Sequence, residues 1–498
     1  MSNNINNSKF DKITQLIEIG EYHKALELLL LLEKEQNHFL IHWYLGHVYF
    51  KLHKYLKAIN QIKKSIDLKS EDSLNLNFLG EIYLEINEPN QAIKFFNQAY
   101  KLDNQNNSII LNLIKANLNI NNVQMSEKYL NLLTKRNPSI YSYHYGLINI
   151  SKRYLTDKLV DEIKKNINDQ NNDNKIYSNL ILAKKSEIDK DYTLEMKYLL
   201  NAHELYNKSK SNLLEQQFNY YNDFLPKFIK NSKNLKINPN TKLNPIFIMG
   251  LPRSGTTLVE RIIVSGKNKV QSLGETDVFD KVFFSNQIIN SLDNDILADL
   301  HQKIIDQYSN QGYPGSNLKF TDKSIGNFLY IDLISKIFPN AKFIHIVRDG
   351  RAVANSLTNV YFWRGYEGIN QWRWGTPDKE LLDLWEKYDK SFLGLAGIQW
   401  KMLVNNINGK GRNLGDDFLT IRYEDMVSNP HKSAKNCIDF IGLDSDSDYF
   451  KKHLNTVKII DANSSKFRIS PWKKSMTSKQ IRMLNDILSD ELKFFNYI

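Results

Sequence analysis

A repeat with a period of 34 residues fills the first part of the chain and restricts its fold more than any other feature. Residues 43–68 (WYLGHVYFKLHKYLKAINQIKKSIDL) align with residues 77–102 (NFLGEIYLEINEPNQAIKFFNQAYKL), so that Gly46 coincides with Gly80. Apolar positions recur at helical spacing, and the small residues allow two antiparallel helices to approach closely. The pattern therefore predicts stacked helix pairs.

The repeat resembles the tetratricopeptide repeat, whose period is about 34 residues. Residues 17–29 fit the second half of a further unit, and residues 111–133 form a weaker copy. We assign residues 9–135 to tetratricopeptide repeats. Such solenoids offer a concave surface to peptides and proteins, so an acceptor protein or peptide held by the repeats is an expected partner.

The chain changes character twice after the repeats. Residues 136–225 keep helical patterning, including one segment with the pattern of a helix pair (178–205), and form either a helical extension or degenerate repeats. Residues 226–245 are basic and contain Pro and Asn, which predicts a linker. Strands and helices alternate over residues 246–498, where we expect a second domain.

The predicted strands of this second domain are continuously apolar. They cover residues 246–250, 342–347 and 417–423, and helices are expected between them. Unbroken apolar strands separated by helices favour a parallel sheet with both faces covered. We therefore predict an α-helical repeat solenoid followed by an α/β domain of P-loop-like architecture with a central parallel sheet. The predicted helices are at 256–266, 326–338, 431–441 and from about residue 350.

The first of these strands runs into a loop that resembles the phosphate-binding pattern G-x-x-x-x-G-K-[ST]. Gly250 and Gly255 take the glycine positions, but Thr256 replaces the lysine, and the cation of the loop is Arg253. Consecutive backbone N–H groups from Ser254 to Thr257, at the start of the following helix, are expected to form a nest for an anion. Three hydroxyl groups add donors: those of Ser254, Thr256 and Thr257.

The missing lysine argues against a nucleoside triphosphate kinase or ATPase, which uses this lysine and Mg²⁺ on the β- and γ-phosphates. The sequence shows no aspartate after a following strand with an obvious role in binding magnesium. A sulfuryl group carries less negative charge than a phosphoryl group, so it can be bound without a metal ion. No metal is expected.

A second cluster lies at the end of the strand at 342–347. Arg348 follows this strand, and Ser356 lies eight residues later in the next predicted helix. An arginine fork with a hydroxyl group suits a phosphate monoester. Asp349 and Arg351 leave another interpretation open, an ion pair at the surface where a helix begins.

Together these motifs resemble those of the PAPS-dependent sulfotransferases, where PAPS is 3′-phosphoadenosine 5′-phosphosulfate. PRSGTT resembles the 5′-phosphosulfate loop of the family, and Arg348 with Ser356 resembles its 3′-phosphate site. The YED motif would place Tyr423 near the nucleotide. The resemblance implies PAPS as sulfate donor and 3′,5′-adenosine bisphosphate as product.

Within that family the chain is most similar to tyrosylprotein sulfotransferases and to bacterial proteins that join such a domain to tetratricopeptide repeats. The stretch SLGETDVF aligns Glu275 with the catalytic glutamate, and KFTDKSIG aligns Lys323 with a catalytic lysine. The resemblance makes Glu275 the general base and gives Arg253 and Lys323 the role of electrostatic stabilisers. SKFRISPWKKSM resembles the segment that closes over the cofactor, with Ser470 and Lys473 as contacts.

Residues 360–385 depart from the family pattern and concentrate tryptophan and arginine where acceptor-binding loops are expected. Arg364 and Arg373 are candidates for contact with an acidic acceptor. Trp385 and, later in the chain, Trp400 are predicted to lie in the core. The roles of three further tryptophans stay open: Trp363, Trp372 and Trp374.

Charge and cysteine content bear on location and partners. The net charge of +11 is spread along the chain, which suits acidic ligands and indicates no nucleic-acid partner. Cys437 is the only cysteine, which excludes an internal disulfide and favours a reducing compartment. We expect a cytoplasmic protein without membrane insertion.

Tyrosylprotein sulfotransferases of animals are membrane-anchored enzymes with disulfides, so the acceptor is the least constrained part of the prediction. We predict sulfuryl transfer to a hydroxyl group of a protein tyrosine. The alternatives are sulfation of a carbohydrate or small hydroxylated metabolite, and a repeat scaffold without activity.

Overall fold

The computed structural model of the chain divides into two compact units. One comprises Met1–Thr156 with Ile305–Pro314, and the other comprises Asp157–Ile304 with Gly315–Ile498. The structure describes residues 7–498 apart from 70–71, 87, 190, 210–214, 217–218, 233–242, 265–269, 285–293, 314–318, 358–365, 369–370, 373–376, 390 and 446–471.

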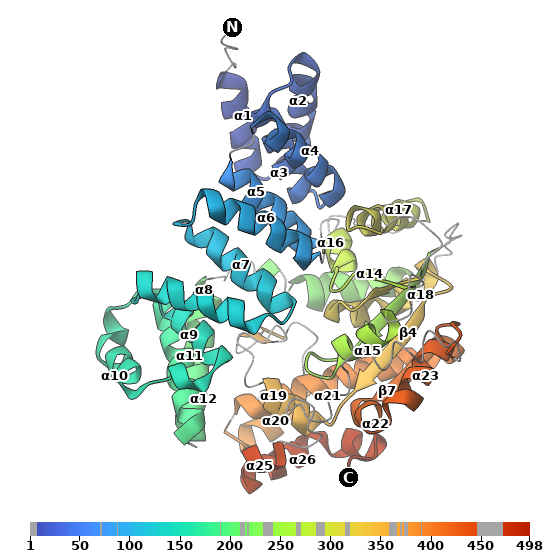
Figure 1. The fold of residues 1–498 in the computed structure, drawn as a ribbon. Helices are drawn as coiled ribbons and strands as arrows, with labels where there is room; N and C mark the ends of the chain where they lie inside the picture. Colours follow the sequence, from blue (N-terminus) through green and yellow to red (C-terminus); the bar gives the residue numbers. More distant parts are fainter. Residues whose placement is uncertain are drawn as a thin grey trace. The chain divides into compact units, whose positions relative to one another are not determined.

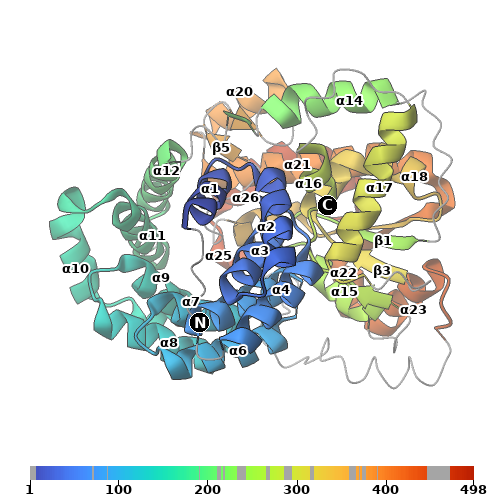
Figure 2. The same cartoon turned by 90° about the horizontal axis from the view of Figure 1, so that it is seen from above.

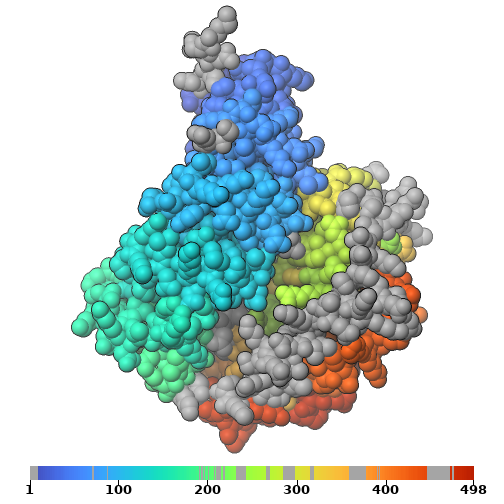
Figure 3. All heavy atoms as spheres, in the orientation of Figure 1, coloured from blue at the N-terminus to red at the C-terminus, as the bar shows by residue number. Residues whose placement is uncertain are grey.

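The first unit consists of antiparallel helix pairs in sequence order, which confirms the predicted repeats (Figure 1). In the space-filling view its surface changes steadily from blue to cyan, as expected when each pair packs on its neighbours in sequence (Figure 3). The pairs are α1 (Asn7–Glu18) with α2 (Tyr22–Glu35), α3 (Phe39–Lys51) with α4 (Tyr55–Leu68), α5 (Ser73–Glu85) with α6 (Pro89–Leu102), and α7 (Asn107–Asn119) with α8 (Val123–Arg136); α9 (Tyr141–Ile150) and η1 (Lys152–Tyr154) follow.

The glycines of the repeat lie where the two helices of a pair cross. A Cβ atom at Gly46 would be 2.4 Å from Cδ1 of Ile62, and one at Gly80 would be 2.5 Å from Cε1 of Phe96. Ile62 and Phe96 are fully buried. The small residue at this position is therefore a requirement of helix packing, as the sequence pattern predicted.

Gly80→Ala is expected to lower the free energy of unfolding of the repeat unit by about 1–3 kcal/mol, because the added methyl group overlaps the ring of Phe96. The matched control is Gly409→Ala, at an exposed helical position where a Cβ atom meets nothing within 4 Å. That change is expected to be neutral or stabilising, by up to about 1 kcal/mol, through helix propensity. Chemical denaturation measures the free energy of unfolding of both variants. Equal changes in the two would contradict a steric overlap between the added methyl group and Phe96.

The second unit begins with helices. These are α10 (Asp157–Asn166), η2 (Ile167–Asp169), α11 (Asn172–Asp189) and α12 (Tyr192–Ser209), and the pair α11 and α12 confirms the predicted helix pair at 178–205. A π-helical turn, η3 (Tyr220–Phe224), leads into α14 (Leu225–Ser232). α14 takes up the first residues of the predicted linker, and its Phe228 packs on Phe283, with ring centroids 5.1 Å apart.

A parallel sheet forms the centre of the second unit, as predicted. Its strand order is β2-β3-β1-β4-β7, and every neighbouring pair is parallel. Seen from above, α15 (Thr256–Val264) and α23 (Pro430–Phe440) lie on one side of the sheet, and α18 (Ile331–Ile337) and α21 (Phe392–Gly411) on the other (Figure 2). The strands are β1 (Asn244–Met249), β2 (Val270–Ser272), β3 (Lys319–Asp322), β4 (Lys342–Val347) and β7 (Phe418–Arg422).

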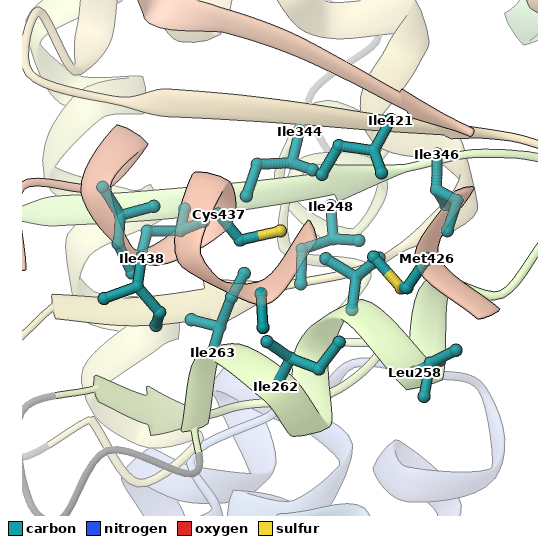
Figure 4. Packing of buried hydrophobic residues seen from close by; sticks show 14 of the residues in the cluster. Ile248, Leu258, Ile262, Ile263, Ile344, Ile346, Ile421, Met426, Cys437 and Ile438 are labelled. Carbon is teal, nitrogen blue, oxygen red and sulfur yellow. The ribbon is translucent and has the colours of Figure 1, made fainter. Parts of the chain in front are cut away.

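Alternate residues of the strands supply two apolar layers. On one face, isoleucines of β1, β4 and β7 pack against α15, α22 (Tyr423–Ser428) and α23, where Cys437 is buried (Figure 4). On the other face, Phe247 packs on Phe343 and Phe279, with ring centroids 5.5 and 5.9 Å away. The predicted sheet with two covered faces is thus present, and it fixes where the strands end.

The remaining elements belong to the second unit, except that α17 (Asn294–Asn310) passes into the first unit at Ile305. Trp385 and Trp400 are buried, which confirms their predicted place in the core. No helix in the described part of the chain is both long and apolar enough to span a membrane. The elements are α16 (Val278–Phe284), α17 (Asn294–Asn310), η4 (Ile325–Tyr330), α19 (Gly350–Leu357), β5 (Tyr366–Gly368), β6 (Gln371–Trp372), α20 (Lys379–Lys387), η5 (Arg412–Asp417), α25 (Trp472–Ser475) and α26 (Ser478–Phe494).

His345 in β4 makes the second unit sensitive to acid. Burial lowers the pKa of this imidazole to about 4, and its Nδ1 donates to Oδ1 of Asn408 at 3.2 Å. The unfolded chain binds a proton near the ordinary pKa of about 6.5, whereas the folded chain does not, so stability is full above that pH and falls towards the folded pKa. Between about pH 7.5 and pH 5 we expect a loss of about 2 kcal/mol.

Denaturant titration of the second unit at several pH values measures this loss. His345→Gln cannot take up the proton, so its stability is expected to depend less on pH, whatever its absolute value. An unchanged pH slope in that variant would refute the assignment.

Candidate functional site

The predicted site residues follow the carboxyl ends of the five sheet strands in their spatial order. Glu275 comes after β2, Lys323 after β3, the loop at 250–257 after β1, Arg348 after β4, and Tyr423 after β7. Ligands of open parallel sheets bind outside the carboxyl ends of the strands, where the chain reverses its direction across the sheet. Here that reversal lies between β1 and β4, and the loop meets Arg348 there.

The backbone of the loop is shaped for an anion. Arg253 and Gly255 have positive φ angles, 74° and 108°. A Cβ atom at Gly255 would lie 2.7 Å from Cδ2 of Tyr423, and one at Gly250 would lie 2.6 Å from the carbonyl oxygen of Ile346. The two glycines thus allow the loop to press against β4 and Tyr423, while Arg253 holds a conformation that costs a non-glycine residue about 1–3 kcal/mol.

The amide cradle is narrower than predicted. The N–H of Ser254 donates to the carbonyl of Leu251 at 3.0 Å, so it belongs to the turn. The N–H groups of Leu258 and Val259 both donate to the carbonyl of Gly255. The first-turn N–H groups of α15 have no acceptor within the helix, so the cradle begins at Thr256 and Thr257.

Arg253 joins the two predicted anion sites. Its Nε donates to Oγ of Ser356 at 3.0 Å, and its carbonyl oxygen accepts from a terminal nitrogen of Arg348 at 2.9 Å. Both residues of the R-x₇-S pair, which are far from the loop in sequence, therefore contact one loop residue. The structure thus brings the loop and the R-x₇-S pair together at Arg253.

Arg348 also has a free donor. Its guanidinium lies over the ring of Tyr423, with Cζ 4.5 Å from the centroid, and its Nε is buried with no acceptor among the described residues. Burial raises the pKa of the Tyr423 hydroxyl, and the charges of Arg348 and Arg253 oppose that shift. A buried donor without a partner beside a second cation is suited to an anionic ligand.

Glu275 and Lys323 form an ion pair at the ends of β2 and β3. Nζ of Lys323 donates to Oε1 of Glu275 at 3.0 Å. The glutamate side chain is 54% exposed and the lysine side chain 12% exposed. A carboxylate open to solvent can accept a proton from a substrate, while the shielded ammonium group holds it in place.

The structure adds residues that the sequence analysis missed. Asp322 ends β3 directly beside β1, although no aspartate at a strand end had been assigned a role. Both of its carboxylate oxygens are engaged: Oδ2 accepts from Thr276 Oγ1 at 2.6 Å, and Oδ1 accepts from the N–H and Oγ of Ser324 at 2.9 and 2.7 Å. The signal available in the sequence was the position of these three residues directly beside Glu275 and Lys323.

Other predictions are corrected or lie outside the described residues. Asp349 and Arg351 form a buried ion pair at 2.8 Å, not a surface pair, because Arg351 is also held by Asn485 and stacks on Trp472. Lys473 is exposed on α25. Five residues lie outside the described part of the chain: Trp363, Arg364, Arg373, Trp374 and Ser470. The side chain of Trp372 is not described either. Within the described residues, no group of three or more His, Cys, Asp or Glu side chains is placed to hold a metal ion.

Comparison with known families agrees with this geometry. Residues 245–448 match the model of the "Sulfotransferase family". This part of the second unit is therefore similar in sequence to the sulfotransferase family. Residues 75–106, which cover α5 and α6, match the tetratricopeptide repeat model. The sulfotransferase domain therefore contains all the described strand ends of the site, and the first unit is a repeat domain.

Relatives of the sulfotransferase domain are distant. It is similar to a putative protein-tyrosine sulfotransferase of Caenorhabditis briggsae, with 21% identity over 49% of this chain and 82% of that protein. The chain is also similar to protein-tyrosine sulfotransferase 2 of Gallus gallus, with 26% identity over 40% of this chain and 51% of that protein. The match thus spans about half the length of the Gallus gallus protein. A solved sulfotransferase domain from the Synechococcus PCC 7002 olefin synthase aligns with 51% of this chain and 98% of its own, with 19% identity and a TM-score of 0.31.

Proposed function

We propose that the second unit transfers the sulfuryl group of PAPS to the hydroxyl group of a protein tyrosine. The observation that carries this proposal is the meeting of Arg253, Arg348 and Ser356 at the end of β1 and β4, beside the Glu275–Lys323 pair. Arg253 and Arg348 place two cations where the 3′-phosphate and the 5′-phosphosulfate of PAPS would bind. The exposed carboxylate of Glu275 is suited to act as a general base.

The residues present fit PAPS on structural grounds. The first-turn N–H groups of α15 have no acceptor within the helix, and the buried Nε of Arg348 has none among the described residues, so both can donate to an anion. Arg348 and Ser356 would hold the 3′-phosphate, and Arg253 with the amides of Thr256 and Thr257 would hold the phosphosulfate. When bound, PAPS supplies an activated sulfuryl group.

The catalytic assignments follow from charge and proton balance. The acceptor oxygen forms a bond to sulfur while the bond from sulfur to the bridging phosphate oxygen breaks. The hydroxyl proton passes to the carboxylate of Glu275, and the departing 3′,5′-adenosine bisphosphate carries negative charge that Lys323 and Arg253 offset. Water competes with the tyrosine hydroxyl group as acceptor of the sulfuryl group. Positioning of the tyrosine in the site favours transfer to the tyrosine.

A protein acceptor is supported by two independent features of the chain. The first unit is a tetratricopeptide repeat domain, an architecture that binds peptides and proteins, and several relatives of the second unit are named protein-tyrosine sulfotransferases. The repeats would hold the acceptor protein while its tyrosine enters the site. Arg364 and Arg373, the residues of the segment 360–385 predicted to contact an acidic acceptor, lie outside the described residues.

Sulfate-labelled PAPS, incubated with the full chain and a panel of acceptors, tests the proposal. The panel contains a tyrosine peptide, the same peptide with phenylalanine, an oligosaccharide and a simple phenol. Label is expected in the tyrosine peptide alone or in preference to the others. Label in the oligosaccharide alone would support PAPS as the donor but contradict a protein tyrosine as the acceptor. If calorimetry detected no binding of 3′,5′-adenosine bisphosphate, PAPS would be excluded as the donor.

A further inference from the structure

A buried hydrogen-bond network lies directly behind the Glu275–Lys323 pair. The carboxylate of Asp322 is fully buried, and Thr276 and Ser324 beside it are each 1% exposed. Three donors of these two residues reach the carboxylate within 2.9 Å. The hydroxyl oxygen of Ser324 in turn accepts from the N–H of Asp277 at 2.8 Å. The network thus joins the loop after β2 to the loop after β3.

The network flanks both members of the pair. Thr276 follows Glu275 in sequence, and Lys323 lies between Asp322 and Ser324. The main chain adds a second connection at the same place, because the N–H of Lys323 donates to the carbonyl of Gly274 at 2.9 Å. Glu275 is therefore held on each side: its preceding residue by the Lys323 backbone, and its following residue by the Asp322 carboxylate.

We propose that Asp322 is a positioning residue for catalysis, which acts through Thr276 and Ser324 to hold the carboxylate of Glu275 and the ammonium group of Lys323 at reacting distance. This inference rests on the proposed function. A side chain on a loop loses precision when its flanking residues move, and the side chain of Glu275 is too exposed to be fixed by packing of its own. Its position is decided by its neighbours.

The chain contains a matched control for this network on the opposite face of the same strand. Thr321, next to Asp322, is also fully buried and also donates to a buried carboxylate, Oε1 of Glu260, at 2.8 Å. Because successive side chains of a strand point to opposite faces, this second hydrogen bond faces α15 and not the Glu275–Lys323 pair. Thr276→Val and Thr321→Val therefore each remove one buried hydrogen bond to a carboxylate, and Thr276→Val also removes the hydroxyl oxygen that accepts from the N–H of Val278 at 3.3 Å.

The test compares the two valine variants in the full chain, using labelled PAPS and the best acceptor of the panel. Thr276→Val is expected to lower kcat by about 10- to 100-fold, with the KM for PAPS within about threefold of wild type, because misplacement of about 1 Å is costly at a reacting centre. Thr321→Val is expected to keep kcat within about threefold of the wild-type value, although its thermal stability falls by an amount similar to that of Thr276→Val. Thr276→Ser restores the hydroxyl group and is expected to restore kcat.

The outcomes separate the two proposals. Equal kcat values for the two valine variants, or no rescue by Thr276→Ser, would overturn the positioning role while the sulfotransferase activity of the wild type stands. Absence of label transfer by the wild type would overturn the proposed function and the inference with it. If Thr276→Val does not fold, Ser324→Ala removes the next bond of the network and carries the same expectation of a fall in kcat at constant KM.

Discussion

Glu275→Gln is expected to reduce kcat for sulfuryl transfer by about 10²- to 10⁴-fold, the range of a general base. The amide cannot accept the proton of the acceptor hydroxyl, yet its oxygen can still accept the hydrogen bond from Nζ of Lys323, now 3.0 Å long. The fold and the donor site should therefore persist. Rates of label transfer from PAPS measure the loss, and calorimetry with 3′,5′-adenosine bisphosphate measures the donor site.

If Glu275 is the general base, Glu275→Gln should lower the rate of label transfer without weakening the binding of 3′,5′-adenosine bisphosphate. Binding of 3′,5′-adenosine bisphosphate should stay within about threefold, since the side chain of Glu275 is not among the donor contacts. Asp490→Asn serves as the control, because Asp490 is an exposed carboxylate on α26 and is not among the predicted site residues. Retention of full kcat by Glu275→Gln would remove Glu275 as the base.

Arg348→Met is the second change with a large expected effect, a loss of about 100-fold in affinity for 3′,5′-adenosine bisphosphate. Methionine keeps an apolar stem of similar length but removes the charge, the bond to the Arg253 carbonyl and the buried donor Nε. The phosphate monoester loses its cation, and the loop loses a contact that fixes Arg253. Calorimetry with the full chain measures the affinity.

A comparison of two nucleotides shows whether Arg348 acts on the 3′-phosphate. Wild type is expected to prefer 3′,5′-adenosine bisphosphate over 5′-AMP, and Arg348→Met is expected to bind the two nucleotides about equally. Arg422→Met is the matched control, since Arg422 ends the neighbouring strand and also stacks on a tyrosine, Tyr497, at 4.6 Å. If Arg422→Met also lost the preference for 3′,5′-adenosine bisphosphate over 5′-AMP, the effect of Arg348→Met would reflect the loss of positive charge in general and not a contact with the 3′-phosphate.

The local structure of the site region followed from the sequence because it depends on neighbours along the chain. The strand at 342–347 matches β4 (Lys342–Val347), and the helix predicted from 256 begins at Thr256. The predicted helix at 326–338 is divided into the 3₁₀ helix η4 and α18. Apolar runs, glycine positions and helical spacing are properties of short segments, and they specified these elements with errors of a few residues.

The contacts that organise the site could not be derived in this way. Thr276 and Asp322 are 46 positions apart, and their hydrogen bond depends on the parallel register in which Ser272 pairs with Thr321. No local pattern encodes that register.

The sequence by itself determined the repeat solenoid and the α/β class of the second unit, because both are recorded in spacing along the chain. It also predicted, through the family resemblance, the residues of a donor site. Only the tertiary structure decided that Arg253 joins the loop to Ser356 and Arg348, and that Thr276, the residue after Glu275, donates to the buried carboxylate of Asp322. These contacts arise where neighbouring parallel strands end together. Their formation depends on strand order and register, which hydrophobic burial over the whole sheet sets.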